Sequence, residues 1–252
     1  MCRAGRSGNC KAFSVEIRNK SQSTLLMICI LPKVGGGREM ARVETKIARG
    51  ETIESWRAVR EVLIDNSTQE QLEDLFVRFF VGRLESRYIE PIQQLNRSSS
   101  NDGAGFAVVT LYCSIVEFLA STRSGQNYVH LSRDTDRKIK SDEYCDSQTL
   151  FVDFLRKQAP FAAVFKTKKN AKSFYTEVRC GLVHEARTKG EWRIRSNTDS
   201  GMAIDVSKKL IYKRRLPELF SEYVELYKKE FLQSKTLQAN LLRKFDHLCE
   251  LD

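Results

Sequence analysis

The chain has 252 residues, of which 41% are hydrophobic and 29% are charged. These proportions are typical of a globular protein of one or two domains, and they exclude collagen-like and wholly disordered chains. The longest uninterrupted hydrophobic run, Leu25–Leu31, is seven residues long, which is far too short to cross a bilayer. The sequence therefore predicts a cytoplasmic protein with no membrane-spanning segment.

The net charge is strongly positive, because 42 Lys and Arg residues stand against 32 Asp and Glu residues. The excess is uneven, since residues 61–120 are acidic and the segments on both sides of them are basic. A surplus of this kind favours a polyanionic partner such as RNA, which releases bound counterions when it binds. The alternative is a solvated basic surface that has no partner.

Cysteine and histidine positions do not indicate a metal site or a disulfide framework. The seven cysteines include no Cys-x-x-Cys pair, and the three histidines, His130, His184 and His247, lie far apart along the chain. We therefore expect reduced thiols, no metal, no cofactor and a metal-independent chemistry.

The N-terminal quarter differs in character from the rest. Residues 1–66 are predicted to form a basic extension with short strands, at Phe13–Ile17 and Leu26–Ile30, and one helix that begins near Glu51. A second domain, residues 67–252, is predicted to open with an N-cap at Ser67 or Thr68. A long helix follows to Leu95, with a kink at Pro91.

The remaining pattern predicts a mainly α fold. Residues 106–119 are apolar nearly all round, as in a buried central helix, and residues 121–146 form a polar loop. Further helices are predicted at 147–157, at 172–189 and from Pro217 to the end of the chain. Between the last two, residues 192–213 alternate with period two. The predicted fold is a helical bundle with a small β hairpin or three-stranded appendage.

One segment, residues 174–187, carries candidate chemistry. On a helix, one side carries a core face formed by Phe174, Tyr175, Val178, Leu182 and Ala186. The other side carries Arg179, Cys180, Val183 and His184. The two polar ends of this second strip enclose small or apolar side chains. Such a strip suits burial against a partner.

Arg179-x4-His184, late in a helical bundle, resembles the Arg-x(4–6)-His signature of HEPN-domain ribonucleases. Two further segments resemble the corresponding segments of bacterial HEPN-like proteins. They are the C-terminal end of the long helix, Arg87–Ile92, and the start of the apolar helix, Gly103–Phe106. The resemblance covers residues 67–250. It implies a homodimer with the motifs at the interface, RNA as the substrate, and a toxin or phage-defence role with an antitoxin or regulatory protein as a possible partner.

Metal-independent RNA cleavage needs a proton carrier and a group that stabilises the charged phosphorane. His184 is the candidate general acid or base, since imidazole exchanges protons near working pH, and Arg179 is the candidate phosphate clamp. The alternatives are a structural interface role for His184 and a salt bridge between Arg179 and Glu177 or another carboxylate of the bundle. Glu177 and Glu185 flank the histidine and are candidates to tune it. Cys180 occupies a position that is usually Asn, Asp or His in active members of the family, and cysteine is a poor hydrogen-bond donor.

Two basic clusters flank the motif and are predicted to contact RNA; they are Lys166, Lys168, Lys169 and Lys172 on one side, and Lys213, Arg214 and Arg215 on the other. The expected product is a 2′,3′-cyclic phosphate. Two alternatives remain open at this point. One is a non-catalytic module that binds RNA, a nucleotide or a protein, and the other is a structural partner of another enzyme.

Overall fold

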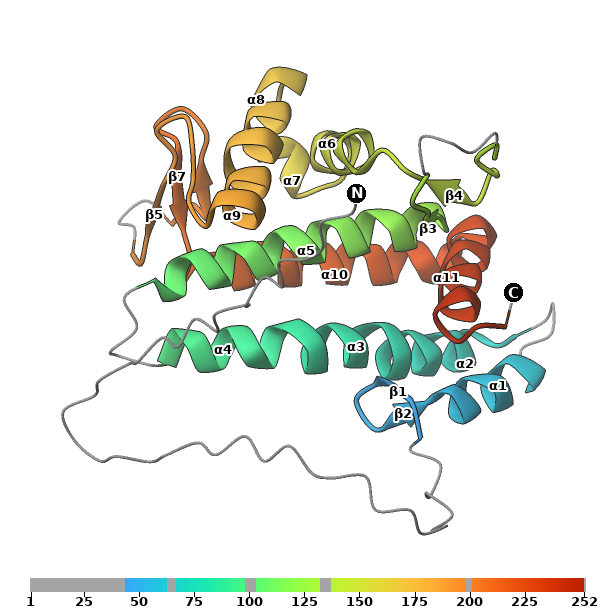
Figure 1. Cartoon of the computed structure of the whole chain (residues 1–252). Coiled ribbons are helices and arrows are strands. Elements are labelled where there is room, and N and C mark those ends of the chain that lie inside the picture. The colour runs from blue at the N-terminus through green and yellow to red at the C-terminus, as the bar shows by residue number, and fades with distance from the viewer. Residues whose placement is uncertain (1–43, 63–66, 98–102, 132–136, 198–200, 252) are drawn as a thin grey trace, which may run out of the picture. The chain divides into compact units, whose positions relative to one another are not determined.

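The computed structural model describes residues 44–62, 67–97, 103–131, 137–197 and 201–251. The chain divides into two units, residues 1–42 and residues 43–252, and the second unit contains all of the elements below. The strands predicted within residues 13–30 lie outside the described residues. In the second unit the prediction of a mainly α fold with a small β element is confirmed (Figure 1).

The helical unit begins earlier than the sequence pattern predicts. Strands β1 (Lys46–Ala48) and β2 (Glu51–Thr52) pair antiparallel and lead into helix α1 (Ile53–Val62). Trp56 of α1 is fully buried, donates a hydrogen bond from Nε1 to Asp246 at 2.8 Å, and packs edge-on against Phe79. Residues 44–62 therefore belong to the bundle and not to an N-terminal extension.

The predicted long helix is present and contains two wider turns. It runs through α2 (Gln69–Leu75), π-helical turn η1 (Phe76–Val81), α3 (Gly82–Leu84), π-helical turn η2 (Glu85–Ile89) and α4 (Glu90–Arg97). Thr68 is the N-cap, and it forms a reciprocal capping box with Gln71. Turn η2 ends just before Pro91, where the proline removes a backbone donor from the helix.

Helix α5 (Ala104–Ser124) is the central helix of the bundle. It packs against α4, α6 and α11, and the side chains of Val108, Ile115 and Leu119 are buried. Its length and apolar composition would allow it to cross a membrane, and 56% of its most apolar window is buried within the protein. These are the properties of a core helix.

Part of the segment predicted as a polar loop forms a helix end and two short strands. Helix α5 continues to Ser124, and strands β3 (Asn127–Tyr128) and β4 (Glu143–Tyr144) pair in parallel beyond it. Helices α6 (Ser147–Lys157) and α7 (Phe161–Val164) follow, and Asp146 caps α6 by accepting from the backbone N–H of Thr149. The predicted boundaries of α6 are confirmed.

The helix that carries the motif starts four residues before its predicted beginning. It consists of α8 (Lys168–Ser173), π-helical turn η3 (Phe174–Arg179) and α9 (Cys180–Glu185). It ends before Ala186, which has a left-handed backbone (φ +53°) and an exposed side chain, so Ala186 is not part of the predicted core face.

The small β element is a three-stranded sheet with strand order β5-β7-β6, formed by β5 (Arg193–Arg195), β6 (Ile204–Asp205) and β7 (Leu210–Tyr212). Strands β6 and β7 form an antiparallel pair, while β5 pairs with β7 in parallel. Ile211 is buried, and Ile194 lies so close to Gly105 of α5 that a Cβ at Gly105 would be 3.0 Å from it.

The predicted closing helix is two helices, α10 (Leu216–Gln233) and α11 (Lys235–Leu248). Ser234 separates them because its backbone is extended, and its hydroxyl accepts from the N–H of Leu237 to cap α11. The two helices complete an aromatic core in which Tyr227 and Phe231 pack against Phe76.

Candidate functional site

Arg179 forms an ion pair with Glu117 of the central helix. Its Nη2 lies 3.0 Å from Oε2 of Glu117, and the two side chains are only 21% and 20% exposed. Arg179 is the last residue of turn η3, and α9, which begins directly after it, packs on α5. The motif arginine is therefore anchored to the bundle. The ion pair engages only one of the two terminal nitrogens of the guanidinium, Nη2.

Glu117 is the centre of a small polar network. Its Oε1 accepts a hydrogen bond from the Ser147 hydroxyl at 2.7 Å and a longer one from the Tyr144 hydroxyl at 3.4 Å. The Arg179 guanidinium also lies 5.4 Å from the ring centre of Tyr175, a cation–π geometry. Burial works to lower the pKa of Arg179, but Tyr175 and Glu117 outweigh it, and the net shift is upward.

His184 lies on the exposed side of α9. Its side chain and that of Val183, which is 49% exposed, point away from the core, while Leu182 is buried. Within the described parts of the chain, no hydrogen bond or ion pair engages the imidazole, and none joins it to Arg179. The strip predicted for the second side of the helix is therefore present, with Arg179 at its inner end and His184 at its outer end.

Cys180 is half-buried beside the arginine, on the helix that faces Cys113 of α5. Cys113 is fully buried, and burial raises the pKa of its thiol to about 12, so it is a neutral thiol at physiological pH. Burial also raises the pKa of Tyr175 to about 12. Cys113 and Tyr175 thus stay uncharged, and Glu117 is the charged group that faces Arg179 on this side.

The two glutamates predicted to tune His184 have other partners. Glu177 accepts from the Ser173 hydroxyl at 2.7 Å and pairs with Lys209 at 3.2 Å. Burial opposes ionisation of Glu177, and these two donors outweigh it, so its pKa is lowered. Glu185 pairs with Arg187 and Lys189. The carboxylate of Glu185 thus holds the turn that follows α9, the carboxylate of Glu177 joins α8 to Lys209, and neither makes a hydrogen bond to the imidazole.

The two predicted basic clusters meet at one place. Lys166 and Arg215 line the same pocket, of about 740 Å³, between α7, α8, β6 and α10. Lys168, Lys169 and Lys172 are exposed on α8. Arg215 pairs with Glu218, and Arg214 donates to Asn197 at 3.4 Å. The side chain of Lys213 lies near Gly105 of α5.

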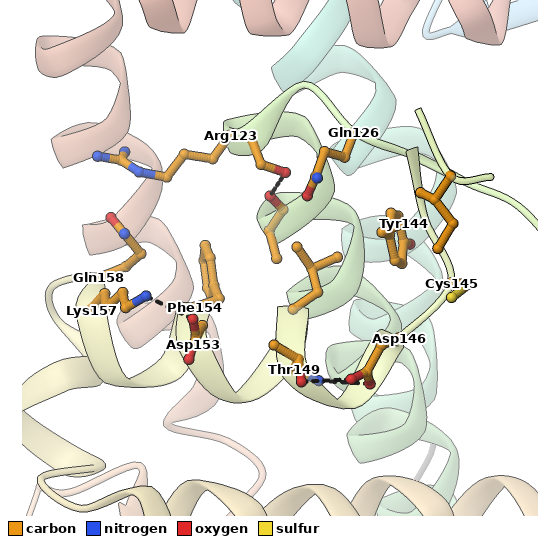
Figure 2. A pocket seen from close by; sticks show the side chains of 14 residues that line it. Arg123, Gln126, Tyr144, Cys145, Asp146, Thr149, Asp153, Phe154, Lys157 and Gln158 are labelled. Atoms are coloured by element: carbon orange, nitrogen blue, oxygen red, sulfur yellow. Dashed lines mark hydrogen bonds and ion pairs between the residues drawn. The ribbon is translucent and has the colours of Figure 1, made fainter. Parts of the chain in front are cut away.

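A second pocket, of about 490 Å³, lies between the end of α5 and helix α6 (Figure 2). Tyr144 lines it and reaches Glu117 with its hydroxyl. Both cations that line it are paired, Arg123 with Glu230 and Lys157 with Asp153. Since both of its cations are neutralised within the protein, this pocket does not indicate an anionic ligand.

Glu117 was not identified from the sequence as the partner of Arg179, although a signal was present. Glu117 is the only charged residue in the apolar stretch from Ala104 to Leu119. A single carboxylate in such a helix needs a partner when the helix packs in a core. In the described part of the chain, no group of three or more His, Cys, Asp or Glu side chains could hold a metal ion.

No family model matches this chain, and no curated protein and no solved structure matches it either.

Proposed function

We propose that this protein is a metal-independent endoribonuclease of the HEPN type that acts on cytoplasmic RNA as a homodimer. The observation that carries the proposal is the arrangement on the motif helix. An anchored guanidinium, Arg179, and an exposed imidazole without a partner in the described residues, His184, lie at the two ends of one strip. Arginine binds phosphate with planar paired donors, and histidine exchanges protons near neutral pH.

The proposed reaction uses the 2′-hydroxyl of RNA as the nucleophile. A base removes its proton, the oxygen attacks the adjacent phosphorus, and an acid protonates the departing 5′-oxygen, which leaves a 2′,3′-cyclic phosphate and a 5′-hydroxyl. His184 carries one of these protons. Arg179 stabilises the additional negative charge of the phosphorane with the guanidinium donors that Glu117 does not use.

The dimer supplies the second proton carrier. Val183 and His184 are exposed on a helix face that adjoins Arg179, so a second copy placed on this face brings two imidazoles to one composite site. One imidazole then acts as base and the other as acid. A toxin or defence role, held in check by an antitoxin or regulatory protein, fits such an enzyme.

The alternative function is a non-catalytic HEPN-like module that binds RNA, a nucleotide or a protein. The ion pair between Arg179 and Glu117 favours it, because a neutralised guanidinium attracts phosphate less strongly than a free one. Cys180 favours it as well, since a thiol replaces a polar side chain beside the arginine.

A cleavage assay separates the two functions. The purified full chain is incubated with total RNA and with defined oligonucleotides, with and without EDTA, and the 3′ ends of the products are analysed for cyclic phosphate. We expect cleavage that EDTA does not affect, that His184→Ala slows by about 10²–10⁴-fold, and that the matched control His130→Ala leaves unchanged. Cleavage at the wild-type rate by both His184→Ala and Arg179→Ala would leave the binding module.

A further inference from the structure

The three-stranded sheet has one face on the bundle and one face toward solvent. Ile194 and Ile211 are paired in register and face α5. Because side chains alternate along a strand, the neighbouring pairs face the opposite way. Arg195 of β5 and Tyr212 of β7 are one such pair, and Arg193 lies on the same side of β5. An arginine and a tyrosine thus lie side by side on the outer face.

The arginines of this face are not neutralised. Arg193 and Arg195 are exposed, and their side chains make no hydrogen bond or ion pair with the residues that the structure describes. Arg214 is exposed in the turn that follows β7, two residues beyond Tyr212, and its side chain donates a hydrogen bond to the neutral Asn197. We call Arg193, Arg195, Tyr212 and Arg214 the sheet platform.

A basic pocket of about 770 Å³ adjoins one end of the sheet platform. Two turns form it, residues 187–192 and 207–209, and Arg193 belongs to both the pocket and the platform. The other cations that line this pocket have carboxylate partners. For example, Nζ of Lys208 lies 3.7 Å from Oδ2 of Asp205. The turn of residues 187–192 follows closely after α9, so the pocket and the sheet platform are formed by residues that come soon after His184 in the chain.

We propose that the sheet platform binds single-stranded RNA, with its arginines on phosphates and one unpaired base stacked on Tyr212. This proposal rests on the ribonuclease function proposed above. It specifies the surface on which the RNA substrate lies, and it specifies that the RNA is single-stranded. Tyr212 is half-buried, so part of its ring is open to solvent. Unpaired arginines beside a partly exposed aromatic ring are the groups that recognise a single strand, because every base offers a face for stacking. In a duplex the bases are already stacked and the ring has no access to them.

The test measures binding without cleavage. The full chain carrying His184→Ala is titrated against fluorescein-labelled oligouridine at several salt concentrations, and anisotropy gives the affinity. Arg193→Gln with Arg195→Gln removes two platform charges. Arg57→Gln with Arg156→Gln removes two exposed charges from α1 and α6 and is the matched control.

We expect the platform substitutions to reduce the slope of log K against log salt by about 1.4, which is about 0.7 for each lost phosphate contact, and the control to leave it unchanged. Tyr212→Leu should weaken binding about tenfold, whereas Tyr212→Phe, which keeps the ring, should bind as the parent does. An RNA duplex should compete poorly with oligouridine.

A platform variant with the same slope as the control variant would overturn the proposal, as would a duplex that competes as well as the single strand. The outcome is separable from that of the cleavage assay. If His184→Ala cleaves at the wild-type rate, the nuclease is refuted while a reduced slope still supports the platform. If cleavage depends on His184 and the slope is unchanged, the platform alone is refuted.

Discussion

The Arg179 guanidinium donates from Nη2 to Oε2 of Glu117 at 3.0 Å, across the packing contact between the motif helix and the central helix of the bundle. The motif arginine is therefore part of the core network as well as of the proposed site. This double role means that its substitutions change stability and activity together, and the two effects have to be measured separately.

The ion pair should appear as an energetic coupling. We expect Glu117→Gln and Arg179→Met each to lower the free energy of unfolding by about 1–2 kcal/mol, because each leaves a largely buried polar partner unpaired. The double variant should lose less than the sum, with a coupling of about 1 kcal/mol. Urea denaturation of the four proteins measures this cycle. Additive losses would mean that the pair contributes no net coupling.

Arg179→Lys distinguishes a planar clamp from a simple positive charge. Lysine keeps the charge, and hence part of the attraction to Glu117, but an ammonium cannot engage two phosphate oxygens in one plane. We expect the cleavage rate to fall about tenfold or more while the unfolding midpoint moves little. Rates under single-turnover conditions and urea curves check both parts. An unchanged rate would show that only charge matters at this position.

Gly181 is required for packing at the end of the motif helix. A Cβ there would lie 2.5 Å from the backbone oxygen of Arg187, which belongs to the turn after α9. Gly181→Ala should therefore cost about 1–3 kcal/mol of stability. Ala186→Gly, five residues later, is the counterpart, because its left-handed φ of +53° suits glycine. It should stabilise the protein by up to about 1 kcal/mol. Thermal unfolding compares the two.

Lys244 gives the stability a pH dependence. It is 7% exposed, and burial, with a further contribution from Arg83, lowers its pKa from 10.5 to about 8. Between these two values the unfolded chain binds a proton that the folded chain does not, so stability rises with pH in this window. Below pH 8 the folded protein bears the full cost of the buried charge.

Replacing this lysine should remove the effect. The difference in unfolding free energy between the wild type and Lys244→Met should shift by roughly 2 kcal/mol in favour of the wild type from pH 7 to pH 9.5. Lys229→Met, which removes an exposed lysine of α10, is the control and should show no such shift. Urea denaturation at the two pH values measures both. A constant difference for Lys244→Met would show that this lysine keeps its ordinary pKa in the folded protein.

Much of the fold was predictable because local patterns specify it. The capping box at Thr68, the apolar character of α5 and the period-two alternation around residues 193–212 each depend on residues close together in the chain. Trp56 was assigned to the wrong unit because its partners, Phe79 and Asp246, lie far away in the sequence.

The sequence by itself determined which helix carries the candidate residues, since the spacing of Arg179 and His184 and the apolar face between Phe174 and Leu182 are local properties. Only the tertiary structure decided what these residues meet. Arg179 pairs with a carboxylate 62 positions away, and the register of β5 on β7 places Arg195 beside Tyr212. Such contacts depend on how the helices and strands pack, and helical or strand periodicity carries no information about the partner across a packing interface.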